Sequence, residues 1–220
     1  MTGLDRRTVG ANFAAAARNY DAAAVLQAEV RARLLERLEL LGFMPGRILD
    51  LGTGTGRALK PLARNCPRAQ LSAIDLTPAM LRRAHHYRPR FRRVNRAAAA
   101  AEQLPFVDKA FDLVFSNLML QWCPDPDRVF AEVRRVLSGQ GVFLFTTLGP
   151  DTLCELRAAW GAVDAHEHVH TFIDMHDIGD ALIRAGFVEP VMDVEHLTLT
   201  YGTARELMRD LRLIGARNAS

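Results

Sequence analysis

The chain has 220 residues, of which 49% are hydrophobic and 24% are charged, and its formal net charge at pH 7 is +3. This length and balance fit one compact domain and exclude a disordered, collagen-like or coiled-coil chain. The longest uncharged run, residues 136–150, is shorter than the roughly 20 apolar residues that a membrane-spanning helix needs. We therefore expect no membrane association.

The cysteines indicate the cellular compartment. Cys66, Cys123 and Cys154 are widely spaced and form no Cys-x-x-Cys pair. An odd number at these spacings is typical neither of a disulfide framework nor of a zinc ribbon, and it favours a reducing compartment. Arg18 and Asp21 interrupt the alanine-rich N-terminal sequence, so no secretory signal is expected. These features predict a cytoplasmic protein.

Apolar runs and helix signals alternate along most of the chain. One helix start is marked by Thr77 as the N-cap and Pro78 at the first helical position. The expected helices are 22–41, 57–65, 77–87, 125–137, 150–160, 174–185 and 203–214. The expected strands are 47–51, 70–75, a strand near 91–95, 111–116, 142–147 and 191–201. This alternation predicts an α/β fold with a parallel, doubly wound sheet.

A glycine-rich turn follows the first predicted strand. Residues 49–56 read LDLGTGTG, so Gly52, Gly54 and Gly56 alternate just before a helix. Without Cβ atoms such a loop lets a ligand approach the backbone, at the edge where doubly wound sheets bind ligands. The dinucleotide pattern G-x-G-x-x-G would need a third glycine where Arg57 stands. The G-x-G-x-G spacing, two residues after Asp50, instead resembles motif I of class I S-adenosylmethionine (SAM) methyltransferases.

Further candidate ligand residues follow the second and fourth predicted strands. Asp75 ends the second strand, where it either accepts hydrogen bonds from a ribose diol or caps a turn. The side chains expected to flank an adenine are Leu76 and Met80. Ser116 and Asn117 end the fourth strand and should open into the same crevice. Trp122 lies shortly beyond them, either on the substrate side of the crevice or in the core.

A basic stretch and a histidine-rich stretch each allow two interpretations. Residues 82–96 contain seven arginines, which form either a solvated face or a patch for an acidic partner. Aromatic residues are sparse there, so nucleic acid is not expected. His166, His168 and His170 alternate on a loop, which is a weaker metal signal than paired histidines on a helix. We expect these histidines to face solvent or substrate and not to hold a metal.

From about Thr8 onward, the chain resembles the biotin-pathway malonyl-(acyl-carrier-protein) O-methyltransferases. The segments that carry the resemblance are 19–21 (NYD), 25–27 (VLQ), 48–56, 102–106 (EQLPF), 116–118, 121–122, 147–153 (TLGPDTL), 172–182 and 197–201 (LTLTY). The glycine motif alone identifies only the SAM-dependent superfamily, whereas residues 147–201 are more specific. The resemblance implies a Rossmann-like class I methyltransferase sheet with an N-terminal helical segment.

The resemblance also implies a reaction. SAM would donate a methyl group to the free carboxylate of a malonyl group on acyl carrier protein or coenzyme A, making the methyl ester that primes biotin synthesis. A carboxylate is already ionised at neutral pH, so no general base and no metal are expected. Two alternatives stay open: a related SAM-dependent enzyme with another acceptor, and a non-catalytic methyltransferase-like partner or assembly protein.

Two groups of site residues follow from the resemblance. The expected SAM-binding residues are Gln27, Asp50, Gly52, Gly54, Gly56, Asp75, Leu76, Met80, Ala101, Glu102 and Ser116. The candidates for positioning the substrate are Tyr20, Asn117, Trp122 and His176. An arginine would hold the substrate carboxylate equally well, and the sequence does not single one out.

The chain departs from the family pattern at two places. Many class I enzymes have an acid that hydrogen-bonds the adenine amino group, and Ala100 occupies that position here. The loss of one such bond would cost about 1 kcal/mol. The family also continues into a further strand, inserted antiparallel, whereas this sequence stops at Ser220. The last strand would then be missing, so we expect either a truncated chain or a sheet edge at the sixth strand that another element or another molecule must cover.

The expected organisation is one SAM-dependent methyltransferase domain over residues 1–220. It comprises an N-terminal helical lid at 1–44, a SAM-binding half at 45–148 and a substrate-side half at 149–220. Acyl carrier proteins are acidic, so two sets of arginines are candidates for docking one. The first is the basic stretch 82–96, and the second is Arg205, Arg209, Arg212 and Arg217.

Overall fold

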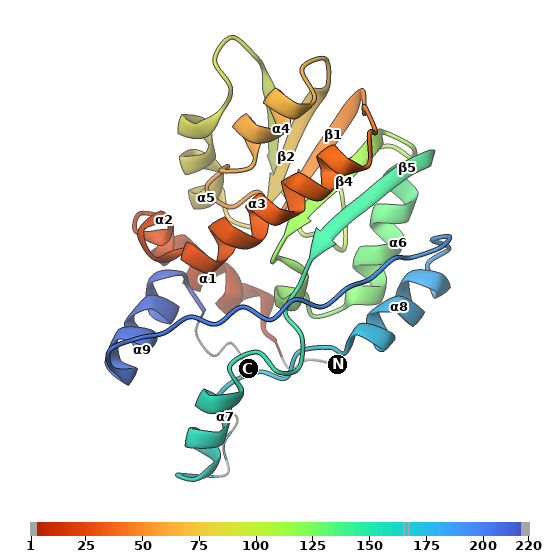
Figure 1. The fold of residues 1–220 in the computed structure, drawn as a ribbon. Coiled ribbons are helices and arrows are strands. Elements are labelled where there is room, and N and C mark those ends of the chain that lie inside the picture. The colour runs from red at the N-terminus through yellow and green to blue at the C-terminus, as the bar shows by residue number, and fades with distance from the viewer. Residues whose placement is uncertain (1–3, 165, 167, 217–220) are drawn as a thin grey trace.

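The computed structural model describes residues 4–164, 166 and 168–216, and its centre is a parallel sheet (Figure 1). The strands are β1 (Arg47–Leu51), β2 (Gln70–Asp75), β3 (Val94–Ala98), β4 (Phe111–Asn117) and β5 (Leu137–Thr146). They are hydrogen-bonded in the order β3-β2-β1-β4-β5, and every neighbouring pair is parallel. The chain order therefore reverses between β1 and β4, the switch point at which such sheets bind ligands.

Helices cover both faces of the sheet. They are α1 (Arg6–Ala16), α2 (Tyr20–Ala23), α3 (Val25–Leu40), α4 (Leu59–Asn65), α5 (Pro78–Ala84), α6 (Pro126–Val136), α7 (Cys154–Gly161), α8 (Met175–Arg184) and α9 (Ala204–Leu213), with 3₁₀ turns at His85–Tyr87 and Leu120–Trp122. Buried side chains of α3 and α4 pack on one face, and those of α6 and α8 pack on the other. No helix in the described part of the chain is long and apolar enough to cross a membrane.

Local signals explain why α6 and α8 form where they do. Asp125 caps α6 through its carboxylate, Pro126 occupies the first turn, and Val129, Phe130 and Val133 bury one face. Asp174 likewise caps α8 by accepting from the His176 backbone N–H. The predicted starts of both helices are confirmed.

The third and fifth strands differ from the sequence prediction. β3 begins at Val94, three residues later than expected, and continues into the alanine run. The preceding residues turn instead, because Phe91 has φ +63° and Arg92 donates to backbone carbonyls of residues 63–69. β5 begins at Leu137, so Gly139 and Gly141 lie within the strand and do not precede it, although regular pairing resumes at Val142 as predicted. The register with β4 passes from Phe111↔Leu137 to Leu113↔Val142, so both glycines lie inside an irregularity of the pairing.

The predicted strand over residues 191–201 is also wrong. This segment runs from α8 past the C-terminal end of β5 to α9 without pairing with any described strand (Figure 1). Ion pairs anchor it instead: Arg33 of α3 contacts Glu195 at 2.7 Å, and Arg37 contacts both Asp193 and Glu195. Alternating side chains alone do not make a strand, because a strand also needs a neighbouring backbone to complete its hydrogen bonds.

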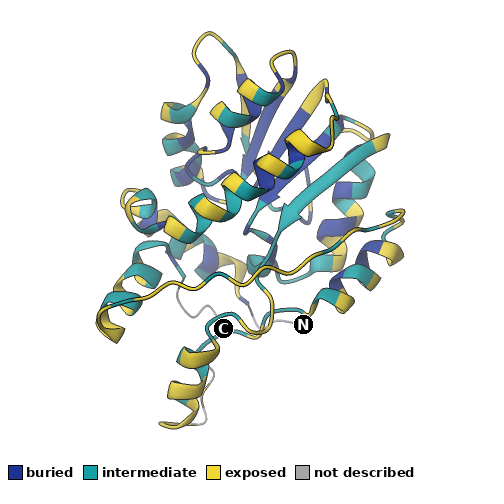
Figure 2. Cartoon of the chain, in the orientation of Figure 1, coloured by how far each residue is buried: buried dark blue, intermediate teal, exposed yellow. Residues whose placement is uncertain are grey.

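The central strands of the sheet are buried, whereas most residues of β5 are only partly buried (Figure 2).

Candidate active site

The glycine-rich loop has a conformation that requires its glycines. Gly52, Gly54 and Gly56 all have positive φ, at 73°, 54° and 82°. A Cβ at Gly52 would lie 2.3 Å from the Cγ of Met119, and one at Gly56 would lie 2.8 Å from the Cα of Ala84. Alanine is therefore excluded by sterics at Gly52 and Gly56, and is strained by φ alone at Gly54. The loop places backbone directly at the C-terminal edge of the sheet.

Asp75 connects this loop to the end of β2. Its Oδ2 accepts from the Gly54 N–H at 2.9 Å, and its Oδ1 accepts from both the N–H and the hydroxyl of Thr77, at 2.8 and 2.5 Å. Thr77 is the N-cap residue of α5 as predicted, but its hydroxyl donates to Asp75 and does not cap the helix. A carboxylate has about four acceptor sites, so one remains for a ligand hydroxyl. Burial raises the pKa of Asp75.

Asp50 lies beneath the loop at the end of β1 and is only 3% exposed. Its Oδ2 accepts a hydrogen bond from the Thr53 hydroxyl at 2.5 Å. Burial raises the pKa of Asp50 to about 7, although the Thr53 hydrogen bond and the charge of Arg31 oppose the shift. A cation placed beside this acid would therefore favour its ionised form.

A cavity opens above the loop, between the C-terminal edge of the sheet and α1. Ten of the residues predicted for the site line it: Tyr20, Gly52, Gly54, Asp75, Leu76, Met80, Ala101, Glu102, Asn117 and Trp122. Ala100, at the position of the missing acid, lines it as well. The structure thus gathers most of the predicted residues around one space.

Five predicted residues lie outside this lining. Asp50 lies beneath the loop and accepts from the Thr53 hydroxyl. Gly56 lies on the side of the loop that packs against Ala84 of α5. Ser116 is buried and donates to the Leu51 carbonyl at 2.9 Å, which joins β4 to β1. Gln27 accepts from the Asn117 side-chain amide through its backbone carbonyl, at 3.1 Å. His176 lies on the first turn of α8, 84% exposed, and contacts Asp174 at 2.9 Å.

The N-terminal helices supply cavity residues that the sequence analysis missed. Arg6 of α1 contacts the buried carboxylate of Glu102 at 3.0 Å, and Phe13 meets Trp122 edge to face, with ring centroids 5.2 Å apart. Both Arg6 and Phe13 line the cavity. A detectable signal was present, because Asp5 caps α1 and Val9 and Phe13 follow at a spacing of four.

A second link joins α2 to the glycine-rich loop. Asp21 accepts a hydrogen bond from the Thr55 hydroxyl at 2.6 Å and contacts the Arg57 guanidinium at 3.1 Å. Burial opposes ionisation of Asp21, but these two donors hold its pKa below the usual value. Arg57 in turn lies over the Tyr87 ring, 4.0 Å from its centroid. The loop is therefore held both by the sheet and by the N-terminal helices.

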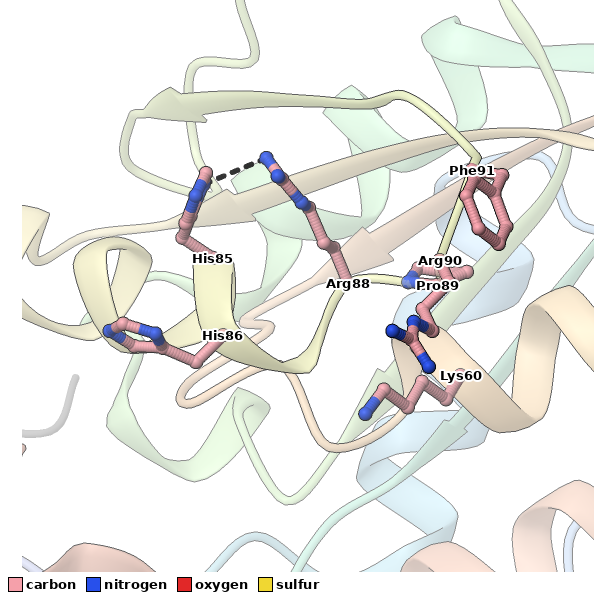
Figure 3. A pocket seen from close by; sticks show the side chains of 7 residues that line it. All are labelled: Lys60, His85, His86, Arg88, Pro89, Arg90 and Phe91. Atoms are coloured by element: carbon pink, nitrogen blue, oxygen red, sulfur yellow. Dashed lines mark hydrogen bonds between the residues drawn. The ribbon is translucent and has the colours of Figure 1, made fainter.

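A separate open pocket lies beside α4 and α5 and is strongly basic (Figure 3). It is lined by Lys60, His85, His86, Arg88, Pro89, Arg90 and Phe91. Arg92 belongs to the same basic stretch but donates to the carbonyls of Ala63 and Cys66, so it supports the backbone. Of the second candidate set, Arg205, Arg209 and Arg212 lie on α9, and Arg217 lies outside the described residues.

The histidine-rich stretch forms local contacts. His168 contacts Asp164 at 2.9 Å and stacks on Trp160, with ring centroids 4.0 Å apart. Within residues 4–164, 166 and 168–216, no group of three or more His, Cys, Asp or Glu side chains is placed to hold a metal ion.

Comparison with known proteins gives matches along nearly the whole chain. A family model described as a methyltransferase domain matches residues 49–145. A malonyl-(acyl-carrier protein) O-methyltransferase of Halorhodospira halophila is 50% identical over 98% of this chain and 73% of its own. The Laribacter hongkongensis protein of the same name is 48% identical over 98% of this chain and 75% of its own.

Solved structures agree with the fold. A SAM-dependent methyltransferase from Thermotoga maritima has a TM-score of 0.63 at 19% identity, covering 82% of each chain. The Haemonchus contortus phosphoethanolamine N-methyltransferase 2, in complex with SAM, has a TM-score of 0.58 at 24% identity. That match covers 72% of this chain and 37% of the other. The predicted class I methyltransferase architecture is thereby confirmed.

Proposed function

This chain belongs to the malonyl-(acyl-carrier protein) O-methyltransferase family, and we propose that it methylates the free carboxylate of a malonyl thioester on acyl carrier protein. The observation that carries the proposal is identity of 50% across 98% of the chain. This identity extends beyond the glycine-rich loop to the N-terminal helices and to residues 149–216. The methyl ester would prime biotin synthesis, as the sequence resemblance implies.

The cavity suits SAM as the methyl donor. Gly52 and Gly54 present backbone without side chains, and Asp75 keeps one acceptor site for a ribose hydroxyl. Leu76 and Met80 would hold the adenine, and Asp50, on β1 between β2 and β4, would accept from the ammonium group of the amino-acid end. When bound, SAM supplies an electrophilic methyl group on a sulfonium sulfur. The missing acid at Ala100 leaves Glu102, held by Arg6, as the carboxylate in this part of the lining.

The acceptor needs orientation and a dry site more than proton transfer. A malonyl carboxylate is ionised at neutral pH, so no base has to activate it. Its negative charge and the positive sulfonium neutralise each other during transfer, so exclusion of water by Phe13 and Trp122 favours the reaction. Alignment of the carboxylate oxygen with the methyl carbon is supplied by binding.

Tyr20 is the candidate best placed to position this carboxylate. Burial raises the pKa of Tyr20, so its phenol stays protonated and can donate a hydrogen bond. Asn117 has less freedom, because its amide nitrogen donates to Gln27 and its Oδ1 accepts from Thr146. Trp122 packs on Phe13, and the exposed His176 of α8 is outside the cavity.

The basic pocket is the proposed docking place for the acidic carrier protein. Lys60, Arg88 and Arg90 are among its lining residues, and Phe91 is fully exposed beside them. No acidic side chain is among the lining residues. Electrostatic complementarity of this kind increases the rate of encounter.

A double charge reversal tests this docking place. Arg88→Glu with Arg90→Glu should raise KM for malonyl-acyl carrier protein and leave KM for carrier-free malonyl-pantetheine unchanged. Arg205→Glu on α9 is the matched control. An unchanged carrier-protein KM in the pocket variant, or a rise only in the α9 variant, would rule this pocket out.

We also propose a division of labour along the chain. Residues 4–44 act as a helical lid, 45–148 hold SAM, and 149–216 face the acyl substrate. Cys66, Cys123 and Cys154 are free thiols, which supports a reducing, cytoplasmic setting.

Transfer of a labelled methyl group tests the reaction directly. The wild-type protein should label malonyl-acyl carrier protein and should not label acetyl-acyl carrier protein, which has no free carboxylate. Succinyl-acyl carrier protein tests the chain-length preference. Labelling of the acetyl form, or no transfer to any of the three despite SAM binding, would contradict the proposal and favour the alternatives of another acceptor or a non-catalytic role.

A further inference from the structure

Arg31 occupies an unexpected place on α3. The helix buries Leu34, Leu35 and Leu38 against the sheet. Arg31 precedes these residues by three, four and seven positions, so it lies on the same inward stripe. It stands toward the N-terminal end of the helix, near the cavity.

This arginine is a partly buried cation. Among the described residues it makes no hydrogen bond or ion pair, whereas Arg33 contacts Glu29 and Glu195 on the outer side of the helix. Its charge instead interacts with Asp50, Asp21 and Tyr20 around the site, and burial lowers the pKa of Arg31. An inward-facing charge of this kind is costly unless something compensates it.

Gln27 supplies a second unsatisfied group beside it. Gln27 and Arg31 are four residues apart on α3, so their side chains share a face. The Gln27 backbone carbonyl accepts from Asn117 at the end of β4, which fixes this turn of the helix over the cavity edge. Its side-chain Oε1 is buried and has no hydrogen-bond partner within the described part of the chain.

We propose that Arg31 binds the carboxylate of the amino-acid end of SAM, while Gln27 Oε1 and Asp50 accept from its ammonium group. The inference rests on the proposed use of SAM. Asp75 on β2 would serve the ribose, and Asp50 on β1 with Asn117 on β4 come next along the sheet edge. A ligand extended along that edge places its far end beside Arg31.

The charges favour an amino acid over the malonyl carboxylate at this position. An α-amino acid carries one anion and one cation close together. Arg57, whose charge also acts on Arg31, is already paired with Asp21. Arg31 then supplies a cation, and Gln27 and Asp50 supply acceptors, which match that pair. A malonyl carboxylate would pair with Arg31 but would leave Gln27 Oε1 unsatisfied.

The inference is tested by comparing a ligand that has the amino-acid end with one that lacks it, in the wild type and in an Arg31 variant. S-adenosylhomocysteine keeps the amino-acid end, whereas 5′-methylthioadenosine lacks it. In calorimetric titrations, Arg31→Met should raise the Kd of S-adenosylhomocysteine by about 10- to 100-fold, the range expected for charge-assisted hydrogen bonds. The Kd of 5′-methylthioadenosine should change less than about twofold. Arg31→Lys should restore part of the loss, because the charge remains without the bidentate geometry.

Arg33→Met is the matched control, on the outward side of the same helix, and should leave both affinities unchanged. The inference is overturned if Arg31→Met binds S-adenosylhomocysteine as the wild type does, or if both ligands weaken equally. A higher KM for the malonyl thioester with unchanged S-adenosylhomocysteine binding would also overturn it, because Arg31 would then hold the substrate. These results leave the proposed function standing, whereas a wild-type protein that binds no S-adenosylhomocysteine would refute both.

Discussion

The binding of S-adenosylhomocysteine should strengthen as the pH rises from 6 to 8, because Asp50 titrates in this range. Burial raises the pKa of Asp50 to about 7 in the free protein. The ligand's ammonium group favours the ionised carboxylate. At low pH the ligand must therefore displace a proton before it gains this interaction.

The size of the effect follows from the ionised fraction. With a pKa of about 7, Asp50 is roughly 9% ionised at pH 6 and roughly 91% ionised at pH 8. If only the ionised form is competent, the apparent Kd scales inversely with that fraction, so it falls by up to about tenfold. Asp75 of β2 and Arg31 of α3 act on the same carboxyl with opposite signs, and the Thr53 hydroxyl donates to it.

Calorimetric titration at pH 6, 7 and 8 measures the dependence, and Asp50→Asn isolates its source. Asparagine keeps an acceptor for the Thr53 hydroxyl but does not titrate, so its Kd should be nearly flat. Burial also raises the pKa of Asp75, so Asp75 is a second candidate source of a pH dependence, and the Asp50→Asn variant distinguishes the two. If the wild-type Kd changes less than twofold between pH 6 and pH 8, or if the Kd of Asp50→Asn changes equally, the pH dependence does not come from Asp50.

Three further predictions concern stability, each measured by urea unfolding. Between pH 4 and pH 7, Asp50 is protonated in the folded protein but ionised in the unfolded chain. The contribution of Asp50 to the free energy of unfolding therefore falls as the pH rises from about 4 to about 7, by up to about 4 kcal/mol. The free energy of unfolding of Asp50→Asn, relative to that of the wild type, should therefore increase from pH 4 to pH 7. A decrease over this range would contradict a raised pKa for Asp50. Gly56→Ala should cost more than about 2 kcal/mol, because it adds a clash to the positive φ, whereas Gly54→Ala should cost about 1 to 2 kcal/mol. Equal losses would disprove the steric argument. Arg135→Met removes hydrogen bonds to backbone carbonyls of residues 104–106 and should cost about 1 to 3 kcal/mol, and a neutral effect would show that those carbonyls are solvated.

Elements with local signals were predictable from the sequence. β1 and β2 are short apolar runs with the predicted site residues Asp50 and Asp75 at or next to their ends, and Asp125 and Asp174 mark helix starts that the structure confirms. The glycine-rich loop and Asp75 meet as predicted because parallel strands bring their C-terminal ends to one edge. Here the local pattern and the long-range arrangement agree.

The errors arose where long-range pairing decides the structure. Residues 191–201 alternate like a strand but have no partner among the described strands, and no local pattern reveals that. The glycines at 139 and 141 look like a turn, yet β4 pairs with the strand on both sides of them. Arg31 was one arginine among many until packing placed it beside Asp50 and Gln27.

Two of the polar contacts that join the N-terminal helices to the site also bear on the timing of catalysis. Arg6 joins α1 to Glu102 on one side, and Asp21 joins α2 to Thr55 on the other. If the N-terminal helices act as the proposed lid, SAM would enter and leave when these helices move, and both contacts would then break in every cycle. Release of the spent donor would then be a gated step that competes with chemistry in setting turnover. Because Arg6 is half exposed, higher ionic strength should weaken its hold and shorten the residence time of that product.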